Sequence, residues 1–191
     1  MAFENLDLVN SDYVFKVSSG APIIVEEKAK GGAGKCHFNS PQEALFIKAK
    51  DQAPVVWSLK NRKCAEAAFC LARADGSTTL HIVEMKSSLS LKTFLHVMEQ
   101  IRGMYLSALA TLSITKTAEP SEVTAYLAYN EDKISHGTGE SLILSKTLVG
   151  GEELPGKREW RKKEIPLPHS KQAKLIIGKR SKGDVTFGEV S

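Results

Sequence analysis

The sequence has few of the residues that mark a disulfide-stabilised or zinc-binding protein. Its 191 residues include three cysteines, Cys36, Cys64 and Cys70, an odd number without a C-x-x-C pair, and five scattered histidines. A disulfide framework needs paired cysteines, and a structural zinc site needs four ligands at short spacings. The sequence therefore favours neither class, and we expect Cys64 and Cys70 to be small core residues.

Long apolar runs are also missing. No segment reaches the roughly 18 consecutive apolar residues that a membrane-spanning helix needs. The N-terminal stretch MAFENLDLVN carries acidic residues where a secretory signal has a basic region followed by an apolar run. We expect a cytoplasmic chain without a membrane partner and, at this length, a single domain over residues 1–191.

Two common catalytic loops are absent as well. The G-x-S-x-G nucleophile elbow of hydrolases that use Ser and His does not occur in the sequence. We expect His136-Gly-Thr-Gly to be a polar loop. The glycine-rich stretch KGGAGK lacks the Ser or Thr that follows the lysine of a phosphate-binding loop, because Cys36 follows Lys35. We expect KGGAGK to be a hairpin loop.

The net charge of +4 is unevenly distributed along the chain. Residues 157–182 contain ten Lys and Arg against two Glu, whereas residues 1–156 have a net charge of −2. Basic residues around a tryptophan can follow a nucleic-acid backbone, although lysines also protect exposed strand edges from pairing. The candidate nucleic-acid contacts are Arg158, Trp160, Arg161, Lys162, Lys163, Lys179 and Arg180.

Strands precede and follow one long helix. Apolar runs predict strands at residues 13–17, 22–27, 54–59, 64–72, 78–86, 123–129, 140–147 and 173–178. Helical spacing of apolar residues predicts a helix over 91–112, and a capping-box pattern beginning at Ser40 predicts another that ends near Lys50. This order predicts an α/β or α+β domain with a mixed central sheet flanked by helices. Its core covers about residues 40–130, and a basic strand segment follows at 151–191.

The strand over 78–86 ends in Glu84-Met85-Lys86. Residues i and i+2 of a strand point to the same side, so Glu84 and Lys86 bring a carboxylate and an ammonium group together. Carboxylates bind Mg²⁺ or Mn²⁺, and a nearby lysine can pair with a phosphate or a nucleophile. The same residue types also occur where a strand simply meets solvent.

The stretch KCAEAAFCLARADGSTTLHIVEMKSS, followed by EQIRGMYLSAL, resembles the PD-(D/E)XK nuclease-like superfamily over about residues 63–105. The first stretch is similar to the central hairpin of the family, with Glu84 and Lys86 as its E-x-K. Gln100 and Tyr105 resemble the Gln and Tyr of the following helix, and Glu43 resembles an acid on an early helix.

The resemblance implies a restriction-endonuclease-like core, Mg²⁺ or Mn²⁺ as cofactor, and DNA or RNA as partner; a dimer is compatible with it. It also implies that Glu84 and Glu66 hold the metal. The catalytic residues that it implies are Glu84, Lys86, Glu66, Gln100 and Glu43.

One departure from the family bears on activity. The acid expected on the strand before E-x-K is replaced around Ala65, and Glu66 stands one position later. A two-residue turn at Asp75-Gly76 would direct Glu66 to the other face of the sheet. A three-residue turn with a bulge at Gly76 would place Glu66 opposite Glu84.

Two functions therefore remain. The chain is either a metal-dependent nuclease that hydrolyses phosphodiester bonds of DNA or RNA, or a catalytically inactive domain with the same fold. The inactive domain would bind protein or nucleic acid as an adaptor, an inhibitor or an immunity-type factor.

Overall fold

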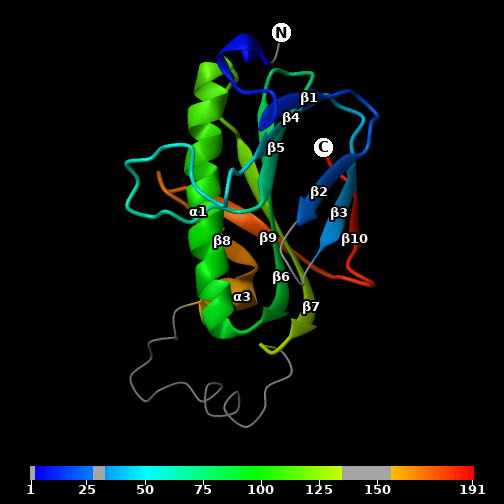
Figure 1. Ribbon diagram of the computed structural model, residues 1–191, viewed down its shortest axis with the longest axis vertical. Coiled ribbons are helices and arrows are strands. Elements are labelled where there is room, and N and C mark those ends of the chain that lie inside the picture. The colour runs from blue at the N-terminus through cyan, green and yellow to red at the C-terminus, as the bar shows by residue number, and fades with distance from the viewer. Residues whose placement is uncertain (1–2, 28–32, 135–155) are drawn as a thin grey trace.

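A mixed seven-stranded sheet forms the centre of the protein in the computed structural model, which describes residues 3–27, 33–134 and 156–191 (Figure 1). Its strands, in spatial order, are β1 (Val14–Val17), β4 (Ala44–Lys48), β5 (Ala67–Ala72), β6 (Thr78–Leu89), β7 (Glu122–Asp132), β9 (Gln172–Lys179) and β8 (Glu164–Pro166). Neighbouring strands are antiparallel except at β6–β7 and β7–β9, where they are parallel. The expected mixed α/β fold with a mixed central sheet is therefore confirmed.

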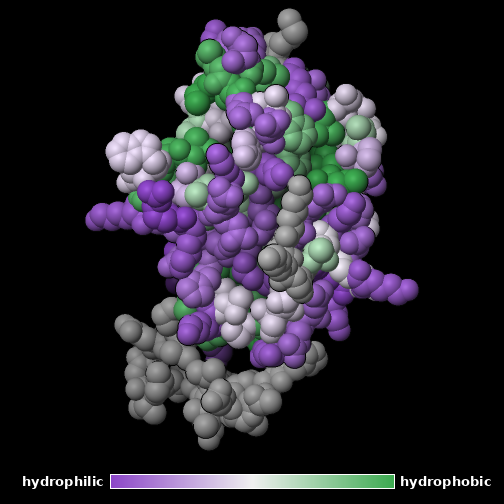
Figure 2. All heavy atoms as spheres, in the orientation of Figure 1, coloured by the Kyte–Doolittle hydropathy of each residue, from purple (hydrophilic) through white to green (hydrophobic). Residues whose placement is uncertain are grey.

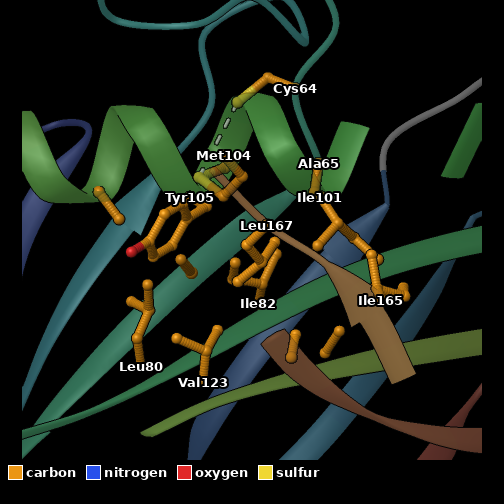
Figure 3. Packing of buried hydrophobic residues seen from close by; sticks show 14 of the residues in the cluster. Cys64, Ala65, Leu80, Ile82, Ile101, Met104, Tyr105, Val123, Ile165 and Leu167 are labelled. Atoms are coloured by element: carbon orange, nitrogen blue, oxygen red, sulfur yellow. Dashed lines mark hydrogen bonds between the residues drawn. The ribbon is translucent and has the colours of Figure 1, made fainter. Parts of the chain in front are cut away.

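One face of this sheet is covered by the long helix α1 (Leu91–Ile114), which runs along it in Figure 1. The helix begins where expected, because the hydroxyl of Ser90 accepts a hydrogen bond from the Thr93 amide at 3.2 Å. Figure 3 shows Ile101, Met104 and Tyr105 of α1 above side chains of β6 and β7. This apolar contact fixes the helix on the sheet.

The opposite face is covered by a small sheet of three strands, β2 (Ile23–Glu27), β3 (Gly34–Asn39) and β10 (Val185–Glu189), in the order β10-β3-β2. The ring of Phe38 on β3 contacts Phe69 and Tyr126 of the large sheet, at centroid distances of 5.1 and 4.9 Å. Strand β6 is thus central and covered on both faces, as its largely apolar sequence predicts, and residues 78–85 are all buried.

The described residues also contain two short helical segments. The 3-10 helix η1 (Leu6–Leu8) lies near the N-terminus, and α3 (Lys157–Lys162) precedes β8. In the orientation of Figure 1, the surface is mostly hydrophilic over its middle, and hydrophobic groups gather toward the N-terminal end (Figure 2).

The helix predicted from Ser40 to about Lys50 is wrong, because this segment forms strand β4. Ala44, Leu45, Phe46 and Ile47 are all buried, which is the pattern of a strand covered on both faces. The Ser40 hydroxyl accepts a hydrogen bond from the amide of Gln42, at 3.1 Å. The serine therefore closes a local turn instead of capping a helix, and both uses share one sequence signal.

The strand predicted over 54–59 is also wrong, because these residues lie in the loop between β4 and β5. Both edges of β4 already pair with β1 and β5, so no sheet edge is open beside it. Strands β3, β8 and β10 and helix α3 were not predicted. The strand predicted over 140–147 and the loop at 136–139 lie outside the described residues.

The loop before β5 crosses α1 at Gly103. A Cβ atom at this position would lie 1.9 Å from the backbone oxygen of Lys63, so only glycine allows the close crossing. Alanine stabilises an ordinary helix by about 1 kcal/mol relative to glycine. In Gly103→Ala we expect the opposite, a loss of roughly 1–3 kcal/mol in the free energy of unfolding, because the loop or helix must move.

Urea denaturation measures this loss. The matched control is Ser113→Ala, at an exposed position of the same helix, which we expect to change stability by at most about 0.5 kcal/mol. A Gly103→Ala variant as stable as the wild type would contradict the close crossing.

Candidate functional site

The register of the β5–β6 hairpin brings two acidic residues together. Its pairs run from Ala72 with Thr78 to Ala67 with Val83. This is the register of the second alternative that the sequence left open, the one with a three-residue turn. The paired residues end at Ala67 and Val83, and Glu66 and Glu84 are the next residues beyond them. The charge of Glu66 raises the pKa of Glu84, so the two side chains interact electrostatically.

The turn of the hairpin explains this register. The amide of Arg73 donates to the carbonyl of Ser77 at 2.9 Å, which leaves three residues in the turn. Gly76 has a φ of 84°, a conformation that costs glycine no steric energy. The carboxylate of Asp75 accepts hydrogen bonds from the amide and the hydroxyl of Ser77, at 2.8 and 2.6 Å. Asp75 and Gly76 thus set the alignment of residues at the other end of the strands.

Glu84 lies in the middle of the sheet with an exposed fraction of 0%. The ammonium group of Lys86 donates a hydrogen bond to Glu84 Oε1. Among the described residues, Glu84 Oε2 has no hydrogen-bond partner. Burial raises the pKa of Glu84 to about 8, against the lowering effect of Lys86. The charges of Glu66 and Glu27 make smaller contributions in the same direction as burial to this raised pKa.

Glu66 is partly buried and directly precedes β5. The side-chain amide of Gln52 donates to Glu66 Oε1 at 2.8 Å. Burial and the charge of Glu27 raise the pKa of Glu66, whereas Lys86 and the Gln52 hydrogen bond lower it. Glu66, Glu84, Lys86 and Glu27 therefore form one electrostatically coupled group, which we call the carboxylate group.

Glu27, the last residue of β2, is the member that the sequence analysis missed. It pairs with Arg180, whose Nη1 atom lies 2.7 Å from Glu27 Oε2. The sequence did contain one indication of Glu27, because the strand predicted over 22–27 ends in acidic residues. Only the packing of the small sheet against the large one brings that end toward Glu84. The Arg180 side chain is fully buried and also donates from Nε to the carbonyl of Gly183. It is therefore not exposed for a phosphate, although the sequence offered it as a nucleic-acid contact.

Gln100 and Tyr105 belong to α1 and are both buried. The side-chain amide of Gln100 donates to the carbonyl of Cys64 at 3.4 Å, and the backbone carbonyl of Gln100 accepts from the amide of Ala65 at 3.1 Å. Gln100 thus holds the segment that leads into Glu66. Tyr105 packs in the core between α1 and the sheet (Figure 3).

Glu43 does not take the place that the resemblance implied. The helix expected to carry it is absent, and Glu43 precedes β4 with its side chain 43% exposed. Its carboxylate pairs with Lys16 on β1 at 3.4 Å. Among the described residues, no group of three or more His, Cys, Asp or Glu side chains is arranged to hold a metal ion.

Trp160, in the basic C-terminal segment, is packed against α1 and contacts one lysine. The Trp160 ring meets Phe94 of α1 edge-on at 5.2 Å, and the Lys163 ammonium lies 3.7 Å from the centre of the same ring. One ring face is thus already occupied. Four of the proposed nucleic-acid contacts are exposed: Arg158, Arg161, Lys162 and Lys179.

Comparison of the chain with protein-family models, with curated proteins and with solved structures finds no match. In the part of the chain that the structure describes, no helix is both long and apolar enough to cross a membrane.

The raised pKa of Glu84 predicts a pH-dependent stability in metal-free buffer. Between pH 5 and about 8 the folded protein keeps a proton on Glu84 that the unfolded chain has released, since an ordinary Glu has a pKa of 4.5. Stability contributed by this group is therefore lost as pH rises, at up to about 1.4 kcal/mol per pH unit. We expect Glu84→Gln to gain stability relative to the wild type progressively over this range.

Urea denaturation at several pH values, with a chelator present, measures the difference. Glu131→Gln, at an exposed strand position, is the control and should track the wild type at every pH. A difference between Glu84→Gln and wild type that stays constant from pH 5 to 8 would contradict the burial of an ionisable group at this position.

Proposed function

We propose that the chain is a nuclease-like domain that hydrolyses phosphodiester bonds with Mg²⁺ or Mn²⁺ held by Glu84 and Glu66. The observation that supports this proposal is the hairpin register, in which Glu66 and Glu84 directly follow the last paired residues, together with the effect of the Glu66 charge on the pKa of Glu84.

The carboxylate oxygens of Glu84 and Glu66 are suitable ligands for a divalent cation. Carboxylate oxygens are the ligands that Mg²⁺ and Mn²⁺ prefer. Glu84 Oε2 is buried without a hydrogen-bond partner among the described residues, and a buried acceptor left unpaired costs free energy. A cation between Glu84 and Glu66 would remove this cost. When bound, the metal would polarise the phosphate and lower the pKa of a coordinated water.

The remaining residues of the site would neutralise charge on the substrate phosphate or orient the Glu66 carboxylate. The Lys86 side chain is 22% exposed, so its ammonium group can reach a substrate phosphate at the surface while it contacts Glu84. There it would offset negative charge that develops on the phosphate. Gln52 orients the Glu66 carboxylate directly, and Gln100 acts through the backbone before Glu66.

The order of elements also supports the proposal. The hairpin β5–β6 carries E-x-K near the end of its second strand, α1 follows, and β7 returns parallel to β6. The resemblance to the PD-(D/E)XK nuclease-like superfamily implied this hairpin followed by a helix, in a restriction-endonuclease-like core.

A second candidate function is binding without cleavage on the same fold, as an adaptor, an inhibitor or an immunity-type factor. One observation favours it: Glu84 is completely buried and already pairs with Lys86. A buried Glu–Lys contact of this kind can remain in a domain that no longer binds a metal.

Metal-dependent thermal stability tests the site. We expect Mn²⁺ at about 100 times its dissociation constant to raise the melting temperature by about 5–10 °C at pH 8.5, where carboxylates are deprotonated. Glu84→Gln and Glu66→Gln should lose this shift, and Glu43→Gln, which changes an acid outside the group, should keep it. A wild type without any shift would contradict the metal site.

Cleavage of plasmid, single-stranded DNA and RNA then separates the two functions. We expect the wild type to cut at least one substrate with Mg²⁺ or Mn²⁺, and Lys86→Ala to lose activity by a factor of about 10² or more. Equal inactivity of wild type and Lys86→Ala on all substrates would favour binding without cleavage.

A further inference from the structure

The connection between β4 and β5, residues 49–66, is unusually long and contains no helix or strand. These two strands are antiparallel neighbours, and such pairs need only about 2–5 connecting residues. Irregular loops of more than about 12–15 residues are uncommon in compact domains, and they frequently bind ligands. In Figure 1 this loop, drawn in cyan, extends beyond α1 on the side away from the small sheet.

Several hydrogen bonds attach the loop to α1. The amide of Val55 donates to the Ser107 hydroxyl at 3.0 Å, and the side-chain amide of Asn61 donates to the carbonyl of Glu99 at 2.6 Å. The amide of Ala65 donates to the Gln100 carbonyl, as described above. These bonds hold the two sides of the loop against the helix, so the residues between them are presented outward.

Trp57 occupies the outward part of the loop. Its exposed fraction of 79% is the largest among the exposed large hydrophobic residues of the described chain. A tryptophan buries 150–250 Å² when it finds a partner, so a nearly free one marks a surface for contact. Its carbonyl accepts a hydrogen bond from Arg62 Nη1 at 2.5 Å, which fixes the backbone beneath the ring.

The charge around Trp57 favours a polyanion. Residues 48–63 carry five basic residues and one acid, Asp51, and of the five, Lys63 pairs with Glu99 of α1. Lys60 and Arg62 are exposed close to Trp57 in sequence. A flat aromatic ring next to phosphate-binding cations is the arrangement that binds single-stranded nucleic acid, because an unpaired base can stack on the ring. Bases within a duplex have both faces covered by their neighbours.

The loop is also joined to the carboxylate group. Gln52 bonds to Glu66 at 2.8 Å, and Trp57 follows Gln52 by five residues. An extended chain of that length spans at most about 18 Å, so a strand bound at Trp57 lies within a few nucleotides of Glu66.

We propose that the loop over 49–66 binds single-stranded DNA or RNA, with Trp57 stacked on a base and Lys60 and Arg62 at the phosphates. The loop then delivers an unpaired segment to Glu66 and Glu84. Delivery of a single-stranded substrate to Glu66 and Glu84 rests on the proposed nuclease function. Binding of a single strand by the loop does not depend on that function.

Tryptophan fluorescence tests the binding directly. The chain has two tryptophans, so Trp160→Phe leaves Trp57 as the only reporter. We expect saturable quenching of this variant by oligothymidylate and oligouridylate of about 12 nucleotides, in chelator and low salt, and much weaker quenching by a duplex of the same length. The two single strands distinguish DNA from RNA as the preferred ligand.

Variants of the full chain, followed by the anisotropy of labelled oligonucleotide, give the contribution of each residue. We expect Trp57→Ala to weaken binding about 5- to 150-fold, and Trp57→Phe to retain most of the affinity. Lys60→Gln should weaken binding and reduce the salt slope by about 0.7. Leu8→Ala and Lys116→Gln change an exposed apolar and an exposed basic residue elsewhere, and both should bind as the wild type does.

Equal affinity of Trp57→Ala and wild type, or no quenching by either single strand, would overturn the proposal. Capture of duplex as tightly as of single strands would overturn the stated ligand class. Binding and cleavage by the wild type separate the two hypotheses: oligonucleotide binding that depends on Trp57, without metal-dependent cleavage, refutes the nuclease function alone. Cleavage of single strands that is unchanged in Trp57→Ala refutes delivery by the loop alone.

Discussion

The register of the β5–β6 hairpin is the constraint on which the candidate site depends. A strand alternates its side chains between two faces, so a shift of one residue would turn Glu66 away from Glu84. The turn at Asp75-Gly76 prevents this shift, since the positive φ of Gly76 and the hydrogen bonds of Asp75 stabilise a three-residue connection. A local conformational preference at one end of the hairpin therefore determines the electrostatics at the other end.

The carboxylate group is costly to fold, and the surrounding layers explain why it remains buried. Strand β6 is covered by α1 on one face and by the small sheet on the other. Its central position removes Glu84 from water, and Lys86 compensates for only part of the lost hydration. Ion pairs of this kind stabilise little, so their occurrence in a central strand points to a role beyond folding.

The same layers position the loop over 49–66. Helix α1 contributes Gly103 to the close crossing and Gln100 to the segment before Glu66. One helix thus anchors both the segment before Glu66 and the loop that carries Trp57. The hydrogen bond between Gln52 and Glu66 connects the aromatic, basic loop to the carboxylate group.

The sequence by itself determined the long helix, the central strand and the turn residues of the hairpin, because each depends on neighbours within a few positions. It identified Glu84, Lys86 and Glu66 but left the register open. The structure decided that register, converted the predicted helix at 40–50 into β4, and brought Glu27 toward Glu84. These outcomes depend on which strands pair and which sheets pack together, and contacts between residues far apart in the chain leave no periodic signal in either segment.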